Sequence, residues 1–228
     1  MNETMKTIRN VLLKALALFI VLNALFAWLT PLEALGKVSL YNSVLPGRLR
    51  FPFGEEPDKA YNLSLFNLPA MFASHELAGA QKAADEYRIV LLGDSATWGF
   101  LLENQDTLSA QLNALDLTTP DDRHVHVYNL GYPTISLTKD LMLLDEALTY
   151  DPDLIVWLTT LEALPYEKQT FTPLVQYNPQ RVRPLIADYD LHIDPDSQDF
   201  ITPTIWDQTI HGQRRALADL WRLQLYGV

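Results

Sequence analysis

Three short stretches rich in apolar residues predict the β-strands of this chain. They are Ile89–Leu92, Val125–Leu130 and Leu154–Leu158, and each runs into polar or turn-forming residues. Short runs of this kind, with several β-branched residues, are typical of strands in a parallel sheet that is covered on both faces.

Helical periodicity fills the segments between these strands. Asp106 or Thr107 is expected to cap a helix that reaches Leu115, and Thr134 or Ser136 is expected to cap the next one. The leucines predicted to share a face are Leu108, Leu112 and Leu115 in the first helix, and Leu141, Leu144 and Leu148 in the second. The alternation of strand and helix predicts an α/β domain with right-handed crossovers between parallel strands.

The chain is less regular on either side of this pattern. Residues 33–84 are predicted to form a linker region, irregular from Gly36 to about Ala70 and helical from Leu65 to Ala84. Residues 165–205 contain six prolines and no convincing strand. Trp206–Tyr226 is predicted to be one helix that packs an apolar stripe on the core, with a membrane-surface helix as the alternative. The stripe consists of Ile210, Leu217, Leu220, Trp221 and Leu225.

Residues 11–32 are predicted to be a transmembrane signal anchor. The eighteen residues from Ala15 to Leu32 carry no charge, and at about 1.5 Å each they extend about 27 Å, close to the hydrocarbon thickness of a bilayer. Lys6, Arg9 and Lys14 precede the run, so residues 1–10 should stay cytoplasmic and the domain should lie outside. A cleavable signal peptide is the alternative, with Ala24–Ala27 as the cleavage region.

Composition narrows the possible partners. The chain has 228 residues and a net charge of −11, which argues against a nucleic-acid partner. It contains no cysteine, which excludes disulfides, thiol catalysis and cysteine metal ligands. No cofactor and no metal are predicted. The partners expected from the sequence are the lipid bilayer, through residues 11–32, and further subunits of a membrane complex.

The most informative motif follows the first predicted strand. Gly93-Asp94-Ser95-Ala96-Thr97-Trp98-Gly99 places a serine hydroxyl between the carboxyl end of that strand and a segment with helical potential. Ligands bind at such positions in open α/β sheets, and free N–H groups there can stabilise negative charge. The alternative is an ordinary strand-to-helix turn in which Asp94 or Ser95 is only a helix cap.

This motif resembles the first sequence block of the SGNH (GDSL-type) hydrolases. Val125–Tyr132 resembles the second block, since it runs as a strand into a glycine turn at a similar distance along the chain. The resemblance covers Tyr87 to about Leu164. It implies a flavodoxin-like doubly wound parallel sheet over residues 85–228, with Ser95 as the nucleophile. It also implies that the backbone N–H groups of Ser95 and Gly131 bind the oxyanion.

Two other blocks of the family depart from this pattern. Thr159-Thr160-Leu161-Glu162 stands where the family has Gly-x-Asn-Asp, and no Asp-x-x-His pair follows it. The match at Asp121–His124 precedes the second strand, away from Ser95. No histidine is therefore assigned as the general base, which stays unknown. The five histidines are His75, His124, His126, His192 and His211.

The acidic loop Asp188–Asp196 is interpreted as a solvated surface loop, with a cation site as the weaker alternative because the loop lacks the glycine and glutamate of an EF-hand.

Two functions follow from these observations. The first is a membrane-anchored, extracytoplasmic ester hydrolase or acyl transferase that acts on an acylated cell-envelope glycan or lipid. The second is a catalytically inactive scaffold or accessory subunit of a membrane complex. Family members usually have five parallel strands, and three are predicted here. Val228 is therefore not expected to be a natural domain boundary; either the polypeptide continues or another subunit covers the open side.

Overall fold

A three-stranded parallel sheet forms the centre of the domain in the part of the chain that the structure describes. The structure is a computed structural model and describes residues 3–45, 47–53, 67–79 and 81–225. The strands are β1 (Glu86–Gly93), β2 (His124–Asn129) and β3 (Leu154–Leu158), and they lie in the order β2-β1-β3. All three predicted strands and the α/β class are confirmed.

The register of the sheet brings the carboxyl ends of the strands to one edge. Leu91 lies opposite Asn129 of β2, and Gly93 lies opposite Leu158 of β3. Central β1 is largely buried, whereas Trp157 and Leu158 of β3 are 36% and 38% exposed. Among the described residues β3 thus forms an open edge with apolar side chains.

The edge at β2 is covered by the chain that precedes it. The side chain of Asn113 accepts a hydrogen bond from Val127 N at 2.8 Å and donates one to Val127 O at 3.0 Å. Val125 N donates to Leu117 O at 2.9 Å. These bonds replace the strand pairing that β2 lacks on this side.

Three helices flank the strands, as the pattern predicted: α6 (Ser95–Trp98), α7 (Leu108–Asn113) and α8 (Leu137–Leu148). Thr107 Oγ1 caps α7 by accepting from Ala110 N at 3.3 Å, and Ser136 Oγ caps α8 by accepting from Lys139 N at 3.2 Å.

The predicted apolar face of α7 is wrong, and that of α8 is confirmed in part. Leu108 and Leu115 are exposed, since α7 turns Asn113 toward β2 instead. In α8, Leu141 and Leu144 are partly buried and pack against the main core as predicted, whereas Leu148 is exposed. The buried residues of this helix include Met142, Leu143 and the charged pair Lys139 and Asp140.

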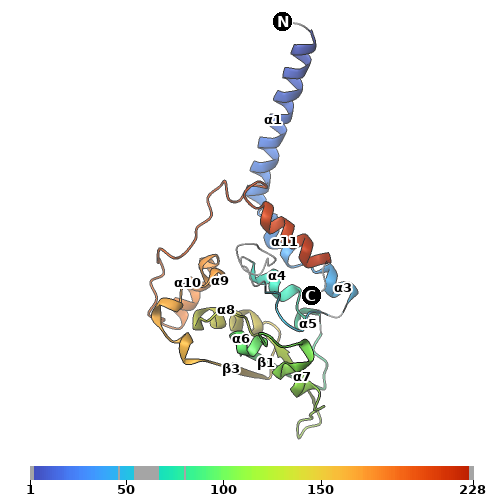
Figure 1. Cartoon of the computed structure of the whole chain (residues 1–228), viewed down its shortest axis with the longest axis vertical. Helices are drawn as coiled ribbons and strands as arrows, with labels where there is room; N and C mark the ends of the chain where they lie inside the picture. Colours follow the sequence, from blue (N-terminus) through green and yellow to red (C-terminus); the bar gives the residue numbers. More distant parts are fainter. Residues whose placement is uncertain (1–2, 46, 54–66, 80, 226–228) are drawn as a thin grey trace.

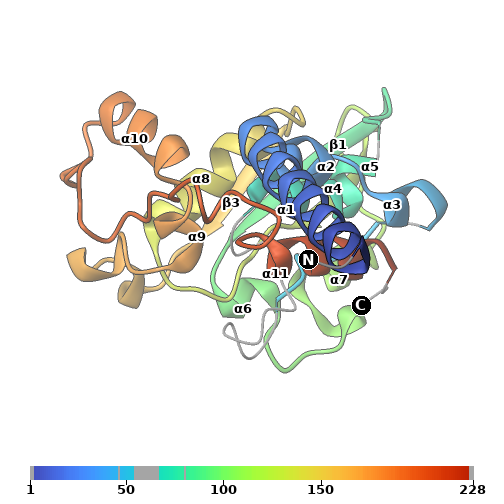
Figure 2. The same ribbon diagram turned by 90° about the horizontal axis from the view of Figure 1, so that it is seen from above.

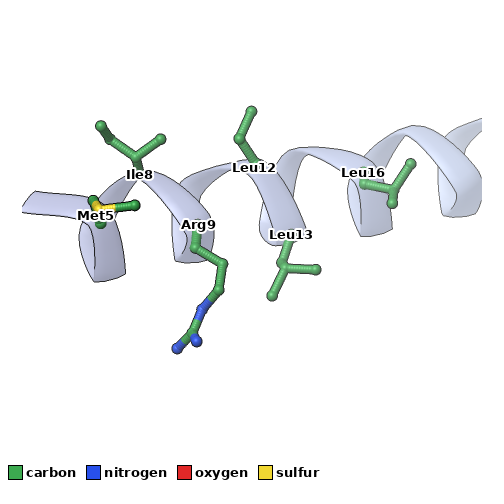
Figure 3. A pocket seen from close by; sticks show the side chains of 6 residues that line it. All are labelled: Met5, Ile8, Arg9, Leu12, Leu13 and Leu16. Carbon is green, nitrogen blue, oxygen red and sulfur yellow. The ribbon is translucent and has the colours of Figure 1, made fainter. Parts of the chain in front are cut away.

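Helix α1 (Glu3–Leu29) projects from the domain, as Figures 1 and 2 show. Within the described chain it is the helix that is long and apolar enough to cross a membrane. It ends at Leu29 rather than Leu32, because Thr30 adopts a left-handed conformation (φ 40°) and Pro31 begins α2 (Pro31–Gly36). Figure 3 shows the row of apolar side chains on its first turns, which share only a shallow hollow.

The linker region contains short helices. They are α3 (Leu40–Val44), α4 (Leu68–Ala73) and α5 (Glu76–Gly79). The predicted irregular segment is therefore partly helical at α2 and α3, while residues 54–66 lie outside the described residues. Phe51, Met71, Phe72 and Leu77 join the main core beside Val90 of β1, so this region packs against the sheet.

The proline-rich segment also contains helices that the pattern did not predict. They are α9 (Pro173–Gln176) and α10 (Pro179–Asp188), and each begins with a proline in its first turn. Proline suits that position because its missing N–H has no partner there in any helix. Three single-turn 3-10 helices complete the described elements: η3 (Asn104–Asp106), η4 (Leu161–Ala163) and η5 (Tyr166–Lys168).

The last helix is shorter than predicted, since α11 covers Arg214–Leu225 and not the whole of Trp206–Tyr226. Side chains between residues 204 and 212 bond to nearby backbone and compete with a helix. Asp207 Oδ2 accepts from Thr204 N at 2.9 Å, and Thr209 Oγ1 donates to Trp206 O at 2.7 Å. The packing interpretation is confirmed for Leu217 and Leu220, which join a small second core at α2 and α4, whereas Trp221 is exposed.

Candidate functional site

Ser95 begins a single helical turn directly after β1. Asp94 caps that turn, since its Oδ1 accepts a hydrogen bond from Ala96 N at 2.9 Å. Gly99 ends the turn in a left-handed conformation (φ 86°), and its N–H donates to Ser95 O at 3.1 Å. The predicted strand-to-helix turn is confirmed, although α6 has only four residues.

The hydroxyl of Ser95 lies at the carboxyl edge of the sheet and is partly exposed. Within the described residues it has no hydrogen-bond partner. Ser95 is thus partly accessible, and no group in the described part of the chain accepts the proton of its hydroxyl.

Two glycines allow the strand ends to approach α6 closely. A Cβ on Gly93, which has φ 153°, would lie 2.2 Å from Thr97 Oγ1. A Cβ on Gly131 would lie 2.4 Å from Trp98 N. Both distances are far below van der Waals contact, so any side chain at either position would push α6 away from the sheet. The resemblance placed Gly131 near Ser95, and Gly131 does pack directly on the helix that Ser95 begins.

Asn129 fixes the loop that carries Gly131. Its Nδ2 donates to Thr97 O at 2.9 Å, and its Oδ1 accepts from Gly131 N at 3.0 Å. The side chain is fully buried. The N–H expected to bind an oxyanion therefore already has an acceptor within the protein, and it would have to exchange that partner for a ligand.

A buried lysine connects the β1 turn with the same loop. Lys139 Nζ, at 0% exposure, donates to Gly93 O at 2.9 Å and to Tyr132 O at 3.1 Å. It also forms an ion pair with the carboxylate of Asp140, whose Oδ2 accepts from Trp157 Nε1 at 3.1 Å. One charged pair thus reaches the carboxyl ends of β1 and β3 and the loop after β2.

Burial affects both members of this pair. It lowers the pKa of Lys139 and raises the pKa of Asp140, while the attraction between the two opposes each shift. Lys139 uses its three N–H bonds on Gly93, Tyr132 and Asp140, which describes a structural clamp rather than a base directed at Ser95.

The third sequence block contributes a threonine. Thr160 Oγ1 donates to Asp94 Oδ2 at 2.9 Å, so it holds the cap of α6 from the β3 side. Leu161 stands where the SGNH hydrolases have an asparagine that serves as an oxyanion donor, and its side chain is 83% exposed. This block therefore stabilises the turn and offers no amide to a substrate.

Arg50 stabilises the far end of the turn. Its guanidinium donates to Gly99 O at 2.9 Å and to Leu102 O at 3.1 Å, and it lies 4.3 Å from the ring centroid of Trp98. Trp98 Nε1 in turn donates to Phe51 O at 2.8 Å. The residues before the sheet thus hold α6 in place.

All five histidines lie in the described residues, and none of them forms a hydrogen bond with Ser95. His75 is fully buried, with Nε2 3.0 Å from Asn129 O and with Nδ1 accepting from Leu77 N at 3.2 Å. Burial lowers its pKa to about 4, so it is a neutral core residue. His75 is thus a buried histidine whose two ring nitrogens both have partners.

The other four histidines lie on the surface or contact residues close to them in sequence. His124 begins β2, at the opposite end of the strand from the site, and Asp121 pairs with Arg123 at 2.9 Å instead of with His124. The ring of His126 lies 4.4 Å from that of Tyr128. His192 and His211 are exposed, and His211 contacts Trp206 with ring centroids 5.2 Å apart.

The acidic loop does not assemble a cation site. Across the described residues, no group of three or more histidine, aspartate or glutamate side chains could hold a metal ion. Asp196 instead lies 3.7 Å from Arg183 at the surface.

Comparison with known protein families, with characterised proteins and with solved structures finds no match to this chain.

Proposed function

We propose that this chain is a membrane-anchored, extracytoplasmic SGNH-type protein, and that Ser95 is the nucleophile of an ester hydrolase or acyl transferase. The observation that carries the proposal is the position of Ser95. Its unpartnered, partly exposed hydroxyl starts α6 immediately after the buried strand β1, against the Gly131 loop. By the resemblance, the substrate class is an acylated cell-envelope glycan or lipid.

The chemistry follows from this arrangement. Ser95 Oγ attacks the acyl carbonyl, and the carbonyl oxygen becomes an oxyanion that needs N–H donors. The Ser95 N–H is one donor. The Gly131 N–H becomes the second if the incoming oxygen displaces Asn129 Oδ1, which lies 3.0 Å away. The general base is left unassigned, because no described histidine forms a hydrogen bond with Ser95.

The order β2-β1-β3 supports the finer fold proposal, since flavodoxin-like sheets are built on the order 2-1-3-4-5. We infer a doubly wound sheet of this kind, of which the described residues supply three strands. The exposed edge at β3 is where a fourth strand would pair.

The second candidate function is a catalytically inactive scaffold or accessory subunit of a membrane complex. Three observations favour it: the histidines lie away from Ser95, the Gly131 N–H is engaged, and Leu161 replaces the family asparagine. Without a base, a serine hydroxyl is a poor nucleophile at neutral pH.

A fluorophosphonate probe on the full-length chain separates the two candidates. A hydrolase should be labelled at Ser95, and Ser95→Ala should abolish labelling. Ser43→Ala is the matched control, since Ser43 is an exposed serine on α3 whose hydroxyl bonds only to Ser39 O. Labelling that persists in Ser95→Ala would remove Ser95 from the mechanism, and an unlabelled wild-type chain would favour the scaffold.

Orientation is tested separately. Because Lys6 and Arg9 precede the apolar helix, the domain should be digested by protease added to intact spheroplasts. Survival of the domain until the membrane is lysed would reverse the proposed topology.

A further inference from the structure

The domain contacts the last turns of α1. Every residue from Glu3 to Leu22 is exposed, whereas Asn23 and Ala27 are buried. His211 N donates to Asn23 Oδ1 at 3.4 Å. Figures 1 and 2 show the segment before α11 running to the base of α1, at the end of the domain from which α1 projects.

The charges of α1 limit where the bilayer can end. If the hydrocarbon core ended on the N-terminal side of Asn23, it would have to be spanned by residues that include Lys6, Arg9 and Lys14. Lys14 would then lie about 12 Å below the outer boundary, close to the midplane of a core about 30 Å thick, where a charge is costly. The charge-free run that begins at Ala15 avoids this only if the membrane extends past Asn23.

The contact with Asn23 then lies at a defined depth. Asn23 precedes Leu29, the end of α1, by six residues, or about 9 Å of helix. Segments that lie in a membrane interface are buried by about 5–10 Å. Whatever part of the domain is held at the level of Asn23 is therefore carried into the outer leaflet.

The segment that reaches Asn23 through His211 carries side chains that suit that environment, and the ring of Trp206 lies 5.2 Å from that of His211. Ile205 is 78% exposed, Trp206 59% and Ile210 37%. None of the three belongs to the hydrophobic clusters of the described residues. Trp28, on the same turns of α1, is 79% exposed. Tryptophan is enriched where a protein meets the headgroups, since its ring is apolar and its N–H is polar.

Polar groups nearby fit the headgroup layer. The carboxylate of Asp207 is occupied by Thr204 N and Oγ1, at 2.9 and 2.7 Å. Arg214 and Arg215 follow at the start of α11, and both are exposed. Their positive charge complements anionic phospholipids in a chain that is otherwise strongly acidic.

We propose that Ile205, Trp206 and Ile210 form a second membrane contact, which inserts into the outer leaflet beside α1 and holds the domain against the phospholipid surface. The proposal rests on α1 being the membrane anchor. It commits to lipid as the occupant, because the surface is continuous with the exposed face of α1 and is bordered by arginines.

Single-cysteine variants of the full-length chain provide the test, because the native chain has no cysteine to interfere. Ile205→Cys is labelled with an environment-sensitive nitrobenzoxadiazole dye and reconstituted in vesicles of phosphatidylcholine and phosphatidylglycerol. Some of the lipid carries a nitroxide quencher near the head of the acyl chain. Leu18→Cys in α1 reports insertion of the anchor. Leu115→Cys, 63% exposed beyond α7 on the far side of the domain, is the matched control.

We expect the dye at residue 205 to lose most of its fluorescence to the lipid quencher and to emit at shorter wavelength, as it does at residue 18. The dye at residue 115 should be unaffected. Quenching at 18 without quenching at 205 would overturn the second contact and leave the anchor intact. Quenching at neither position would overturn both. Quenching at 205 in vesicles that hold no other protein identifies lipid, rather than a membrane protein, as the partner.

Discussion

Replacing Lys139 with methionine removes a buried ammonium group and preserves most of the side-chain volume. The change leaves Gly93 O and Tyr132 O without the donor that now lies 2.9 and 3.1 Å from them. It also leaves the carboxylate of Asp140, 3% exposed, with Trp157 Nε1 as its hydrogen-bond donor but without a counterion.

These contacts set the loss in the free energy of unfolding that Lys139→Met should cause. Removing one partner of a buried ion pair typically costs about 3–5 kcal/mol, because the other charge stays buried. The double variant Lys139→Met/Asp140→Asn removes both charges. Gly93 O still accepts from Tyr132 N at 2.9 Å, and Tyr132 O still accepts from Thr134 N at 2.7 Å. Only the lost hydrogen bonds of Lys139 then count, at about 0.5–1.5 kcal/mol each. The double variant should therefore be more stable than the single one. A domain is stable by about 5–15 kcal/mol, so the single change consumes a large share of that margin.

Urea denaturation of the full-length chain in mild detergent, followed by near-ultraviolet circular dichroism, measures these free energies. Lys37→Met is the matched control: Lys37 is exposed at the end of α2, and its loss should change stability by less than about 0.5 kcal/mol. The clamp interpretation is refuted if Lys139→Met costs less than about 1 kcal/mol. It is also refuted if the double variant is no more stable than the single one.

Three further predictions concern the pH dependence of stability and the open edge of the sheet. Burial raises the pKa of Glu76 from 4.5 to about 7, so ionisation of this carboxyl disfavours the folded protein, and stability is lost as pH rises through 7. In thermal unfolding, Glu76→Gln should therefore stabilise the protein by about 1–2 kcal/mol at pH 8 and change little at pH 4. Burial alone would raise the pKa of Asp153, but Arg88 N–H, Arg123 and Lys82 lower it to about 2, so its contribution is present above 3.8 and lost as pH falls through 2. Asp153→Asn should cost about 1–2 kcal/mol at neutral pH and little near pH 2, and equal losses at both would contradict this sign. Because the open edge at β3 can pair with a second copy, we expect the chain to self-associate there. Leu158→Lys should reduce this self-association in sedimentation velocity, whereas an equal effect of Leu115→Lys would point away from the edge.

The elements that sequence predicted well are those whose signal is local. Leu154–Leu158 was predicted with its observed bounds because an apolar run between turn residues marks a strand. Thr107 and Ser136 were among the predicted caps for a similar reason, since a side-chain oxygen at the first turn has a local partner.

The errors arise where tertiary contacts override the apolar pattern. Leucine spacing gave the wrong buried face in α7, because β2 uses the amide of Asn113. In α8 it found Leu141 and Leu144 but missed the buried charges of Lys139 and Asp140. The start of α11 was placed too early because Thr204, Asp207 and Thr209 form local turns through their side chains. Hydropathy does not encode such polar contacts.

The candidate site shows the same division. The motif located Ser95 and the glycine turn at Gly131, since both follow strands whose ends must meet in a parallel sheet. Asn129, Lys139 and Thr160 carried no signal strong enough to select them, because each acts on a residue at least 32 positions away. Asn129 lies in the segment that resembles the second block, and Thr160 lies in the segment that departs from the third, whereas Lys139 lies in neither.

These buried polar residues serve both candidate functions in the same way. Lys139, Asn129 and Thr160 hold the Ser95 turn by contacts that are complete without a substrate or a general base. A scaffold needs this rigidity to keep its fold, and a hydrolase needs it to keep its nucleophile and oxyanion donors in place. Stability measurements on the Lys139 variants therefore report on the contacts that hold the Ser95 turn, which both functions need. The two candidate functions differ in the reactivity of Ser95, because that reactivity requires a general base, which the residues holding the turn do not supply.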